Sequence, residues 1–464
     1  MKRSALLTLV LCAGMPVLAQ SPNLTLTSAS GESSVQLYGV LDLGVGKVDH
    51  SYTFSNSYSN SIDPRPQKYA VQSATGMFNG GISGSRLGLK GSTSLGEGWN
   101  AIAQVETSLN LQSGSVSNGV LSAAQNQVAS GSKTPGEYNS DSANSGQLFS
   151  RMAFFGVSAD RWGTLTAGRN TSFMLDSVGA FDAVGAQNFS PIAYSGTYGG
   201  GGETDNSRID TSLKYRVKID KFSIGLLHKF GGVTGSTSAR GADQALLGYE
   251  SGPFAMQFIY EAAKDAVSVT SLEVLTQTPV LVAGSTVGYT NVYTSTNQVA
   301  ASFYDTKSYM VLARYQLSAL ALKGGFDRQE FSNASSPDSD ATMTSIFGQS
   351  IGKVTVAPMT QTNGVATKKV LNVFWLTAGY DVTAKFNTAI GYYHVAQNDF
   401  SGGTSTPANK PGSGTFGSIL LDYHFTKAFD TYAGCMTSQY RDGMASGFNY
   451  GSNKIVGLGA RYMF

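Results

Sequence analysis

Apolar and polar residues alternate with a period of two along most of this chain. The clearest example is 253–261, where one face carries Phe254, Met256, Phe258 and Tyr260. Residues 208–217 and 308–317 alternate in the same way. Because a β-strand projects successive side chains to opposite faces, each range forms one apolar and one polar face. Residues three and four apart do not group by polarity, as they would on an amphipathic helix.

The alternation predicts about sixteen strands. They span residues 34–48, 81–92, 97–111, 148–158, 162–170, 207–218, 221–230, 243–251, 253–263, 304–317, 319–331, 371–382, 385–396, 415–425, 428–440 and 453–464. An even number of antiparallel strands suits a closed bacterial barrel whose chain ends lie on the same side. We therefore expect an all-β fold, a transmembrane antiparallel β-barrel, rather than a soluble sandwich.

The connections between these strands alternate between short and long. The short ones are 93–96, 159–161, 218–220, 251–252 and 383–384, and the long ones are 50–80, 112–147, 171–206, 264–303 and 332–370. An outer-membrane barrel has short periplasmic turns and long extracellular loops. A β-sandwich has shorter and more even connections. The asymmetry therefore favours the membrane barrel.

The first and last strands are expected to close this barrel. Alternation in 35–43 places Gln36, Tyr38 and Asp42 opposite the apolar face, and 456–464 alternates up to the terminal Phe464. Unclosed, such strands would expose a long edge that invites aggregation. A terminal Phe after alternating apolar residues also resembles the signal read by the outer-membrane assembly machinery, which we therefore expect as a partner.

The N-terminus has the features of an export signal. Lys2 and Arg3 precede an apolar stretch over 5–18, and small residues precede a cleavage point between Ala19 and Gln20. The stretch is too short for a membrane anchor, and Leu11 before Cys12 argues against a lipoprotein. We assign 1–19 to a signal peptide and 20–464 to the barrel. Removing the signal leaves one cysteine, so the mature chain has no intrachain disulfide.

Composition excludes other classes of protein. Lys and Arg number 32 and Asp and Glu 30, which lacks the basic excess of a nucleic-acid binder. Mean hydropathy is −0.08, as expected when outward residues are apolar and inward residues polar. The chain is also rich in glycine, with 55 residues, and in Tyr and Phe. Nothing in it marks a boundary between domains.

Several short motifs, taken in order, resemble the Gram-negative general porins, and the β-proteobacterial branch most closely. They include Ser85–Gly91, then Leu95–Gly98, Leu148–Ser158 and Trp162–Arg169, beside the terminal Phe464. The resemblance covers essentially the whole mature chain. It implies a sixteen-stranded homotrimer in the outer membrane, surrounded by lipid and lipopolysaccharide. It also implies that loop 171–206 folds inward and narrows the channel.

The resemblance further implies which residues line the constriction. It suggests a basic wall of Arg86, Arg151 and Arg208, facing loop carboxylates such as Asp176 and Asp182. The alternation agrees that Arg86, Lys90 and Arg151 point into the lumen, because an arginine facing lipid at mid-membrane would cost about 2–4 kcal/mol. By the same argument, we expect lumen positions for Asp42, Lys214, Arg216 and Arg461.

These expectations predict a water-filled channel for passive diffusion of small hydrophilic solutes and ions, with weak to moderate anion preference. The alternative is a substrate-specific channel for a small anionic or polar nutrient, with Phe189, Tyr194 and Tyr198 as pore contacts. An enzyme is disfavoured, since none of the four histidines lies in a nucleophile motif. No cofactor or metal ligand spacing is found, and loop oxygens alone do not establish Ca²⁺ binding.

Overall fold

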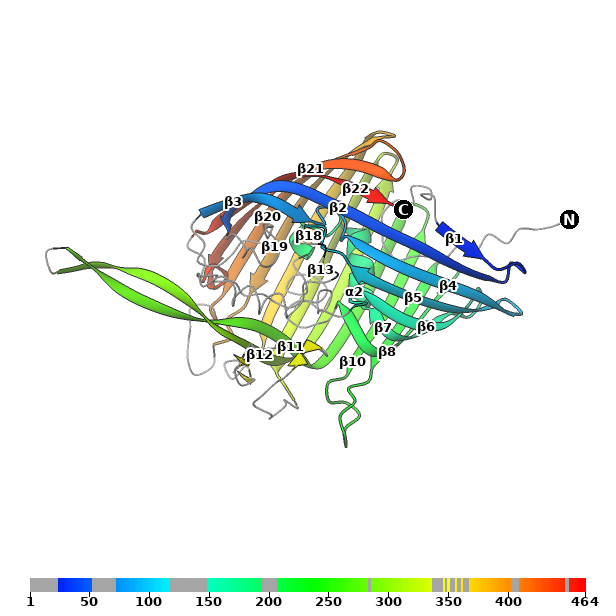
Figure 1. Ribbon diagram of the computed structural model, residues 1–464, viewed down its shortest axis with the longest axis horizontal. Coiled ribbons are helices and arrows are strands. Elements are labelled where there is room, and N and C mark those ends of the chain that lie inside the picture. Colours follow the sequence, from blue (N-terminus) through cyan, green and yellow to red (C-terminus); the bar gives the residue numbers. More distant parts are fainter. Residues whose placement is uncertain are drawn as a thin grey trace.

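The computed structural model is a closed antiparallel β-barrel (Figure 1). It describes residues 24–51, 72–112, 114, 116, 148–193, 207–282, 285–335, 367–401, 409–446 and 450–464, together with short segments between 345 and 361. The expected signal peptide, 1–19, lies outside these residues. Within the described part, no helix is long and apolar enough to cross a membrane.

Sixteen strand positions make up the barrel wall. The second is interrupted: β3 and β4 both pair with β2 and are separated by a bend at 80–85. The wall consists of β2 (Ser33–Ser51), β3 (Gln72–Asn79), β4 (Arg86–Gly96), β5 (Trp99–Ser108), β6 (Met152–Ala159), β7 (Gly163–Thr171), β8 (Arg208–Ile219), β9 (Phe222–Lys229), β10 (Ala242–Ser251), β11 (Phe254–Val282), β12 (Ser285–Leu317), β13 (Leu320–Asn333), β18 (Lys369–Thr383), β19 (Phe386–Gln397), β20 (Gly412–His424), β21 (Phe429–Asp442) and β22 (Ser452–Met463). Each predicted strand overlaps one of these.

The barrel closes between its first and last strands, as expected. β2 pairs with β22 from Val40↔Met463 to Val48↔Ile455. Phe464 then exchanges two backbone hydrogen bonds with Gly39. The short β1 (Leu24–Thr27) pairs with β2 just beyond this point. The backbone of the C-terminal residue is thus part of the hydrogen-bonded wall, which leaves no open edge there.

The two ends of the barrel differ, and we call them the turn end and the loop end. At the turn end, tight turns join β8 to β9 and β10 to β11, with positive φ angles at Asp220 (52°) and Gly252 (57°). Long connections lie at the other end. One of them is not the loop predicted over 264–303: β11 and β12 continue through it as a paired hairpin that projects far beyond the barrel (Figure 1). The predicted loop 50–80 likewise contains β3. Strand-forming Val, Thr and Tyr residues favour the β11–β12 extension.

Burial agrees with the predicted assignment of side chains to the two faces on β11 and β12 but reverses it on β6, where Phe155 is 68% exposed and Met152 and Phe154 pair with the inward Glu106 and Gln104. On β11, Met256 and Phe258 are 40% and 42% exposed, whereas Ala255 and Ile259 are 6% and 0% exposed. β12 alternates in the same way over 308–315. Exposed apolar side chains therefore cover the outside of the wall, as a lipid-facing surface requires.

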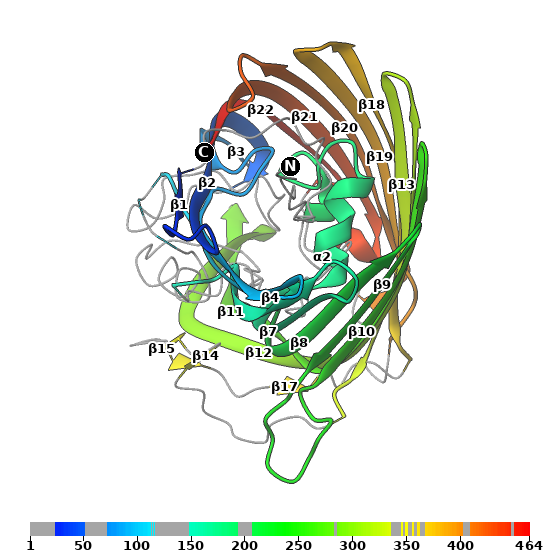
Figure 2. The ribbon, with the colours of Figure 1, turned by 90° about the vertical axis from the view of Figure 1, so that its right-hand side faces the viewer.

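The segment after β7 folds inside the barrel. It contains α2 (Phe173–Val178) and two 3₁₀ turns, η2 (Gly179–Phe181) and η3 (Pro191–Ala193), and Figure 2 shows α2 within the ring of strands. Its apolar side chains join a buried cluster with inward residues of the wall, including Ile259, Met310, Leu312, Trp375 and Tyr393. One side of the barrel interior is thus a packed core, and these inward apolar residues are covered by the segment rather than by water.

Candidate functional site: the constriction of the barrel

The inward segment, which we call the constriction segment (171–193), is fixed first at β10. Ser172 caps α2 by accepting a hydrogen bond from the amide of Leu175. The amide of Phe173, which α2 leaves unpaired, donates to Oε1 of Gln244 on β10 at 2.8 Å. The Phe173 ring lies over Gly225 of β9, where a Cβ would come within 2.5 Å of the ring. Glycine at this inward position therefore makes room for the segment.

The middle of the constriction segment is fixed to β18 and β19. Trp375 donates from Nε1 to the carbonyl of Phe181 at 2.9 Å, and the amide of Ala183 donates to Oγ1 of Thr377 at 2.8 Å. Tyr393 donates its hydroxyl proton to Oδ1 of Asp182 at 2.9 Å. These side chains hold the segment against the wall by directed bonds as well as by apolar packing.

Asp182 has a different place from the one predicted for it. Its carboxylate is 1% exposed and accepts the amides of Val184 and Ala186 in addition to the Tyr393 hydroxyl. Burial raises its pKa above the ordinary value of 3.8. A charge so enclosed is not presented to solutes, so Asp182 shapes the segment instead of forming an acidic face of the channel.

The end of the described segment reaches the strands that close the barrel. Phe189 is fully buried between Phe78 of β3 and Tyr432 of β21. It contacts both rings edge to face, with ring centroids 6.0 Å apart for Phe78 and 6.3 Å apart for Tyr432. Asn188 donates to the carbonyl of Asn79 at 3.3 Å. The segment therefore runs along the interior from β9 to β21 and β3. Phe189 packs against the wall, while Tyr194 and Tyr198, the other proposed pore contacts, lie outside the described residues.

Of the predicted basic wall, Arg86 and Lys90 lie on β4, and Arg151 directly precedes β6. Arg86 and Arg151 both approach Glu106 of β5, Arg86 at 3.7 Å and Arg151 at 2.5 Å from Nε. Tyr38 donates to the second oxygen of Glu106 at 2.8 Å. Lys90 lies over the Tyr38 ring, 5.6 Å from its centroid. The two guanidinium groups thus share one carboxylate, and both remain partly exposed.

Glu106 was not predicted as a site residue. Extending the alternation through 97–111 would have placed it on the inward face, because its register partner Gly88 lies between inward Arg86 and Lys90. Alternation cannot show that two arginines converge on it. Arg314 of β12 was missed as well; it lies on the inward face, pairs with Glu250 at 2.8 Å, and adds a cation near the turn end.

Asp176 lies at the base of the constriction segment, not opposite Arg86 and Arg151. Lys214 Nζ is 2.5 Å from its carboxylate, and Arg216 is 3.9 Å away. Lys214 also donates to the carbonyl of Thr171 at 2.8 Å. The three side chains therefore form one ion-paired group that joins the wall to α2.

Arg208 is the first residue of β8 and pairs in register with Thr171, where the chain returns to the wall. It is only 4% exposed. A buried guanidinium is shielded from passing solutes. Arg208 therefore differs from Arg86 and Arg151, whose side chains remain partly exposed.

Asp42, expected to face the lumen, points to the inside of the wall but is fully buried. It accepts the amides of Gly81, Ile82 and Ser83 at 2.8–3.0 Å, and the Tyr432 hydroxyl at 2.5 Å. These bonds hold the bend between β3 and β4. The residue that follows the bend is Arg86 at the start of β4, so Asp42 positions the basic wall without facing the channel.

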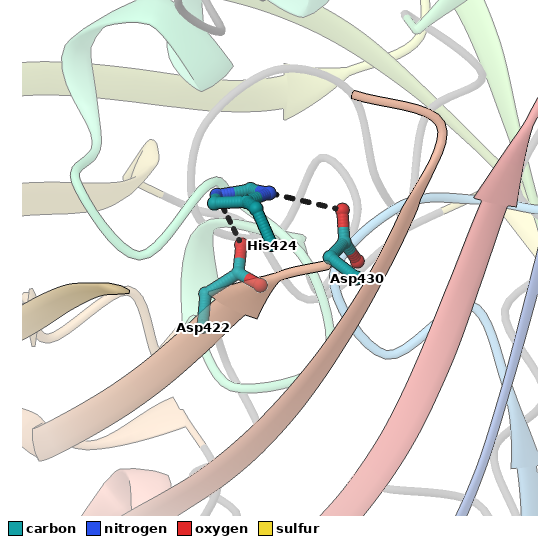
Figure 3. A group of neighbouring side chains, drawn as sticks. All are labelled: Asp422, His424 and Asp430. Atoms are coloured by element: carbon teal, nitrogen blue, oxygen red, sulfur yellow. Dashed lines mark ion pairs between the residues drawn. The ribbon is translucent and has the colours of Figure 1, made fainter. Parts of the chain in front are cut away.

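Arg461 is inward and paired with carboxylates. Its guanidinium lies 2.7 Å from Asp430 and 3.9 Å from Asp422. Figure 3 shows His424 between these two carboxylates. Its Nε2 lies 3.5 Å from Asp422, and its Nδ1 lies 3.5 Å from Asp430. Histidine and carboxylates are possible metal ligands. Arg461 already supplies positive charge to this group, so we treat it as an ion-pair cluster of the wall.

Comparison with known proteins agrees with this geometry. A family model described as Gram-negative porin matches residues 5–357. An outer membrane porin protein of Bordetella pertussis is 33% identical over 159 residues, and the alignment spans 34% of this chain and 34% of that protein. The chain thus aligns with about a third of the length of this relative.

Solved structures share the fold at low sequence identity. The anion-selective porin from Comamonas acidovorans has a TM-score of 0.57 at 16% identity, covering 93% of this chain and 100% of that one. The trimer form of OmpT from Vibrio cholerae has a TM-score of 0.52 at 14% identity, covering 93% and 99%. With a barrel of the same architecture and a family model matched over most of its length, this chain belongs to the Gram-negative porins, barrel proteins of the bacterial outer membrane.

Proposed function

We propose that this porin is a homotrimeric channel through which small hydrophilic solutes and ions diffuse passively, with weak to moderate preference for anions. A sixteen-stranded wall encloses a lumen wide enough for water. The constriction segment fills one side of it. Solutes then pass between that segment and the wall that carries Arg86 and Arg151.

The observation that carries the proposal is the excess of positive charge on this wall. Arg86 and Arg151 share the single carboxylate of Glu106, and Lys90 lies nearby on the same face. The two predicted loop carboxylates, Asp176 and Asp182, are engaged elsewhere. Fixed cations in a narrow, poorly screened passage lower the energy of anions more than that of cations.

The ion preference is tested by reversal potentials in planar bilayers under a KCl gradient. We expect the wild type to favour chloride, and the double variant Arg86→Gln/Arg151→Gln to lose most of that preference. Arg328→Gln is the matched control, because Arg328 lies on the outward face of β13. Cation selectivity of the wild type would contradict the proposal.

General diffusion rather than substrate specificity is tested by liposome swelling with graded sugars and organic acids. A smooth decrease with solute size is expected, because Phe189 of the constriction segment is buried against the wall and offers no aromatic surface to a solute. One solute far faster than others of its size would favour the specific channel. The trimer is supported by the trimer form of an outer membrane protein with this fold, and cross-linking of the purified protein tests it.

A further inference from the structure

Arg151 faces the inside of the barrel although the strand that follows it would direct it outward. Met152, the first residue of β6, pairs in register with the inward Glu106, whereas Ala153 and Phe155 belong to the outward face. A regular strand would give Arg151 the same outward direction as Ala153. The chain bends at Arg151 instead, and its Nε donates to Glu106. The inward position of this cation therefore depends on how the chain before β6 is held.

Arg169 of β7 holds that chain one residue earlier, at Ser150. It is the register partner of Ala153 and so lies on the outward side of the wall, where it is only 7% exposed. Its Nε and Nη2 atoms both donate to the carbonyl of Ser150, at 2.9 and 2.8 Å. Its Nη1 lies 2.5 Å from Oδ1 of Asp210. A planar guanidinium that donates twice to one carbonyl fixes the direction of that carbonyl as well as its distance.

Ser150 is held from a second side by β5, the strand that carries Glu106. The side chain of Ser150 is fully buried, and its Oγ accepts the amide of Ser108 at 3.2 Å. The amide of Arg151 donates to the carbonyl of Glu106 at 3.1 Å. The chain that leads into β6 is thus fixed between β5 and β7, and Arg169 supplies the side-chain contact from β7.

An irregularity in the pairing of β7 with β8 directs Arg169 toward Ser150. The register shifts between Gly168 and Asn170, and Gly168 has a φ of 131°. A Cβ at Gly168 would come within 2.4 Å of the carbonyl oxygen of Ala153, so β7 packs closely on β6 here. From the inner side, Asn170 donates from Nδ2 to Oγ of Ser212 at 3.0 Å. The wall therefore fixes the backbone of Arg169 before its side chain makes any contact.

We propose that Arg169 is a positioning residue for the ion preference of the channel, which it controls through Ser150 and Arg151. Asp210 offsets its charge, and its guanidinium lies on the outer side of the wall. Arg169 therefore acts by holding the chain in place, not by attracting anions itself. This inference rests on the proposed function of an anion-preferring channel and names a residue outside the lumen that this preference requires.

The proposal is tested by a double-mutant cycle, with reversal potentials in planar bilayers under a KCl gradient as the readout. Arg169→Gln should lower the chloride-to-potassium permeability ratio about twofold, because Arg151 is no longer held beside Glu106. In the Arg151→Gln background, the same substitution should leave the ratio unchanged. An equal decrease in both backgrounds would show that Arg169 acts independently of Arg151 and would overturn the proposal.

Two further variants separate position from charge. Arg169→Lys keeps the charge but cannot donate two hydrogen bonds in a planar fork, so it should also lower the permeability ratio. A wild-type ratio in Arg169→Lys would overturn the proposal, and this variant serves equally if Arg169→Gln folds poorly. Arg441→Gln is the matched control, since Arg441 is an exposed arginine on the outward face at the loop end of β21. It should leave the ratio unchanged.

The position of residue 151 is also measured without reference to ion preference. In the Cys435→Ser/Arg151→Cys variant, residue 151 carries the one cysteine of the mature chain, and its modification by a water-soluble thiol reagent can be timed. Adding Arg169→Gln should change that rate several-fold, because the chain at 150–151 is no longer fixed. An unchanged rate would overturn the positioning role. Cation selectivity of the wild type together with a changed rate would instead contradict only the proposed ion preference.

Discussion

Arg151 donates a hydrogen bond from Nε to Oε1 of Glu106 over 2.5 Å, on the inner wall of the barrel. The same carboxylate also faces Arg86 and accepts the Tyr38 hydroxyl. Glu106 is 3% exposed, so its charge is shielded from the lumen more than the guanidinium groups are. Arg86 and Arg151 therefore present positive charge to solutes, while the buried Glu106 carboxylate holds their guanidinium groups in place.

Removing the charge of Glu106 should strengthen anion preference. In Glu106→Gln, one compensating negative charge leaves the wall, and we expect the chloride-to-potassium permeability ratio to rise about two- to fivefold. Reversal potentials in planar bilayers measure it. Glu330→Gln should leave the ratio unchanged, because Glu330 lies on the outward face. An unchanged ratio in Glu106→Gln would show that Arg86 and Arg151 do not set selectivity.

The hydroxyl of Tyr393 should hold the constriction segment in place. In Tyr393→Phe, the buried carboxylate of Asp182 loses a donor, which costs about 1–3 kcal/mol and loosens the segment. We expect noisier single-channel currents with a larger mean conductance. Tyr392→Phe is the control, since Tyr392 is the outward neighbour and is 50% exposed. Identical recordings from both variants would argue against this anchor.

Asp42 should stabilise the barrel through the bend between β3 and β4. In Asp42→Ala, three amides and the Tyr432 hydroxyl lose their acceptor, and we expect a loss of about 3 kcal/mol in stability. This loss is measured by heating the protein in detergent and following the shift in gel mobility that accompanies unfolding of the barrel. Asp49→Asn alters an exposed carboxylate of the same strand, 3.9 Å from Lys47, and should be neutral. Equal melting temperatures would refute the role of Asp42.

The projecting part of the β11–β12 hairpin should be dispensable for conduction. Replacing residues 266–303 by a short turn keeps the barrel register, which already pairs Ala263 with Thr306. We expect unchanged assembly and single-channel conductance, because the removed strands lie outside the wall. Deleting 174–192 instead should raise conductance, since that segment occupies the interior. A hairpin deletion that changes conductance would place the hairpin over the pore.

The sequence alone predicted the wall well, because alternation is a local property. A strand with one face in lipid and the other inside must repeat every two residues, so Met256 and Ile259 could be assigned to opposite faces without coordinates. The closure of 35–43 with 456–464 followed from the need to leave no edge. The hairpin over 264–303 escaped prediction because apolar and polar residues do not alternate regularly along it.

The tertiary structure decided what each inward side chain does. Alternation gives Asp42 and Arg86 the same inward direction, yet only Arg86 keeps an open face beside the channel. At Arg208 a register shift in β8 breaks the alternation, and the neighbouring Ile209 is the residue buried in the interior. The path of residues 171–193 determines which part of the wall is covered, and that path depends on contacts with strands far away in sequence, such as Trp375 and Tyr393. The strand repeat determines the face to which a side chain in a regular strand points. Its exposure and its ion pairs depend on which other segments of the chain pack over that face.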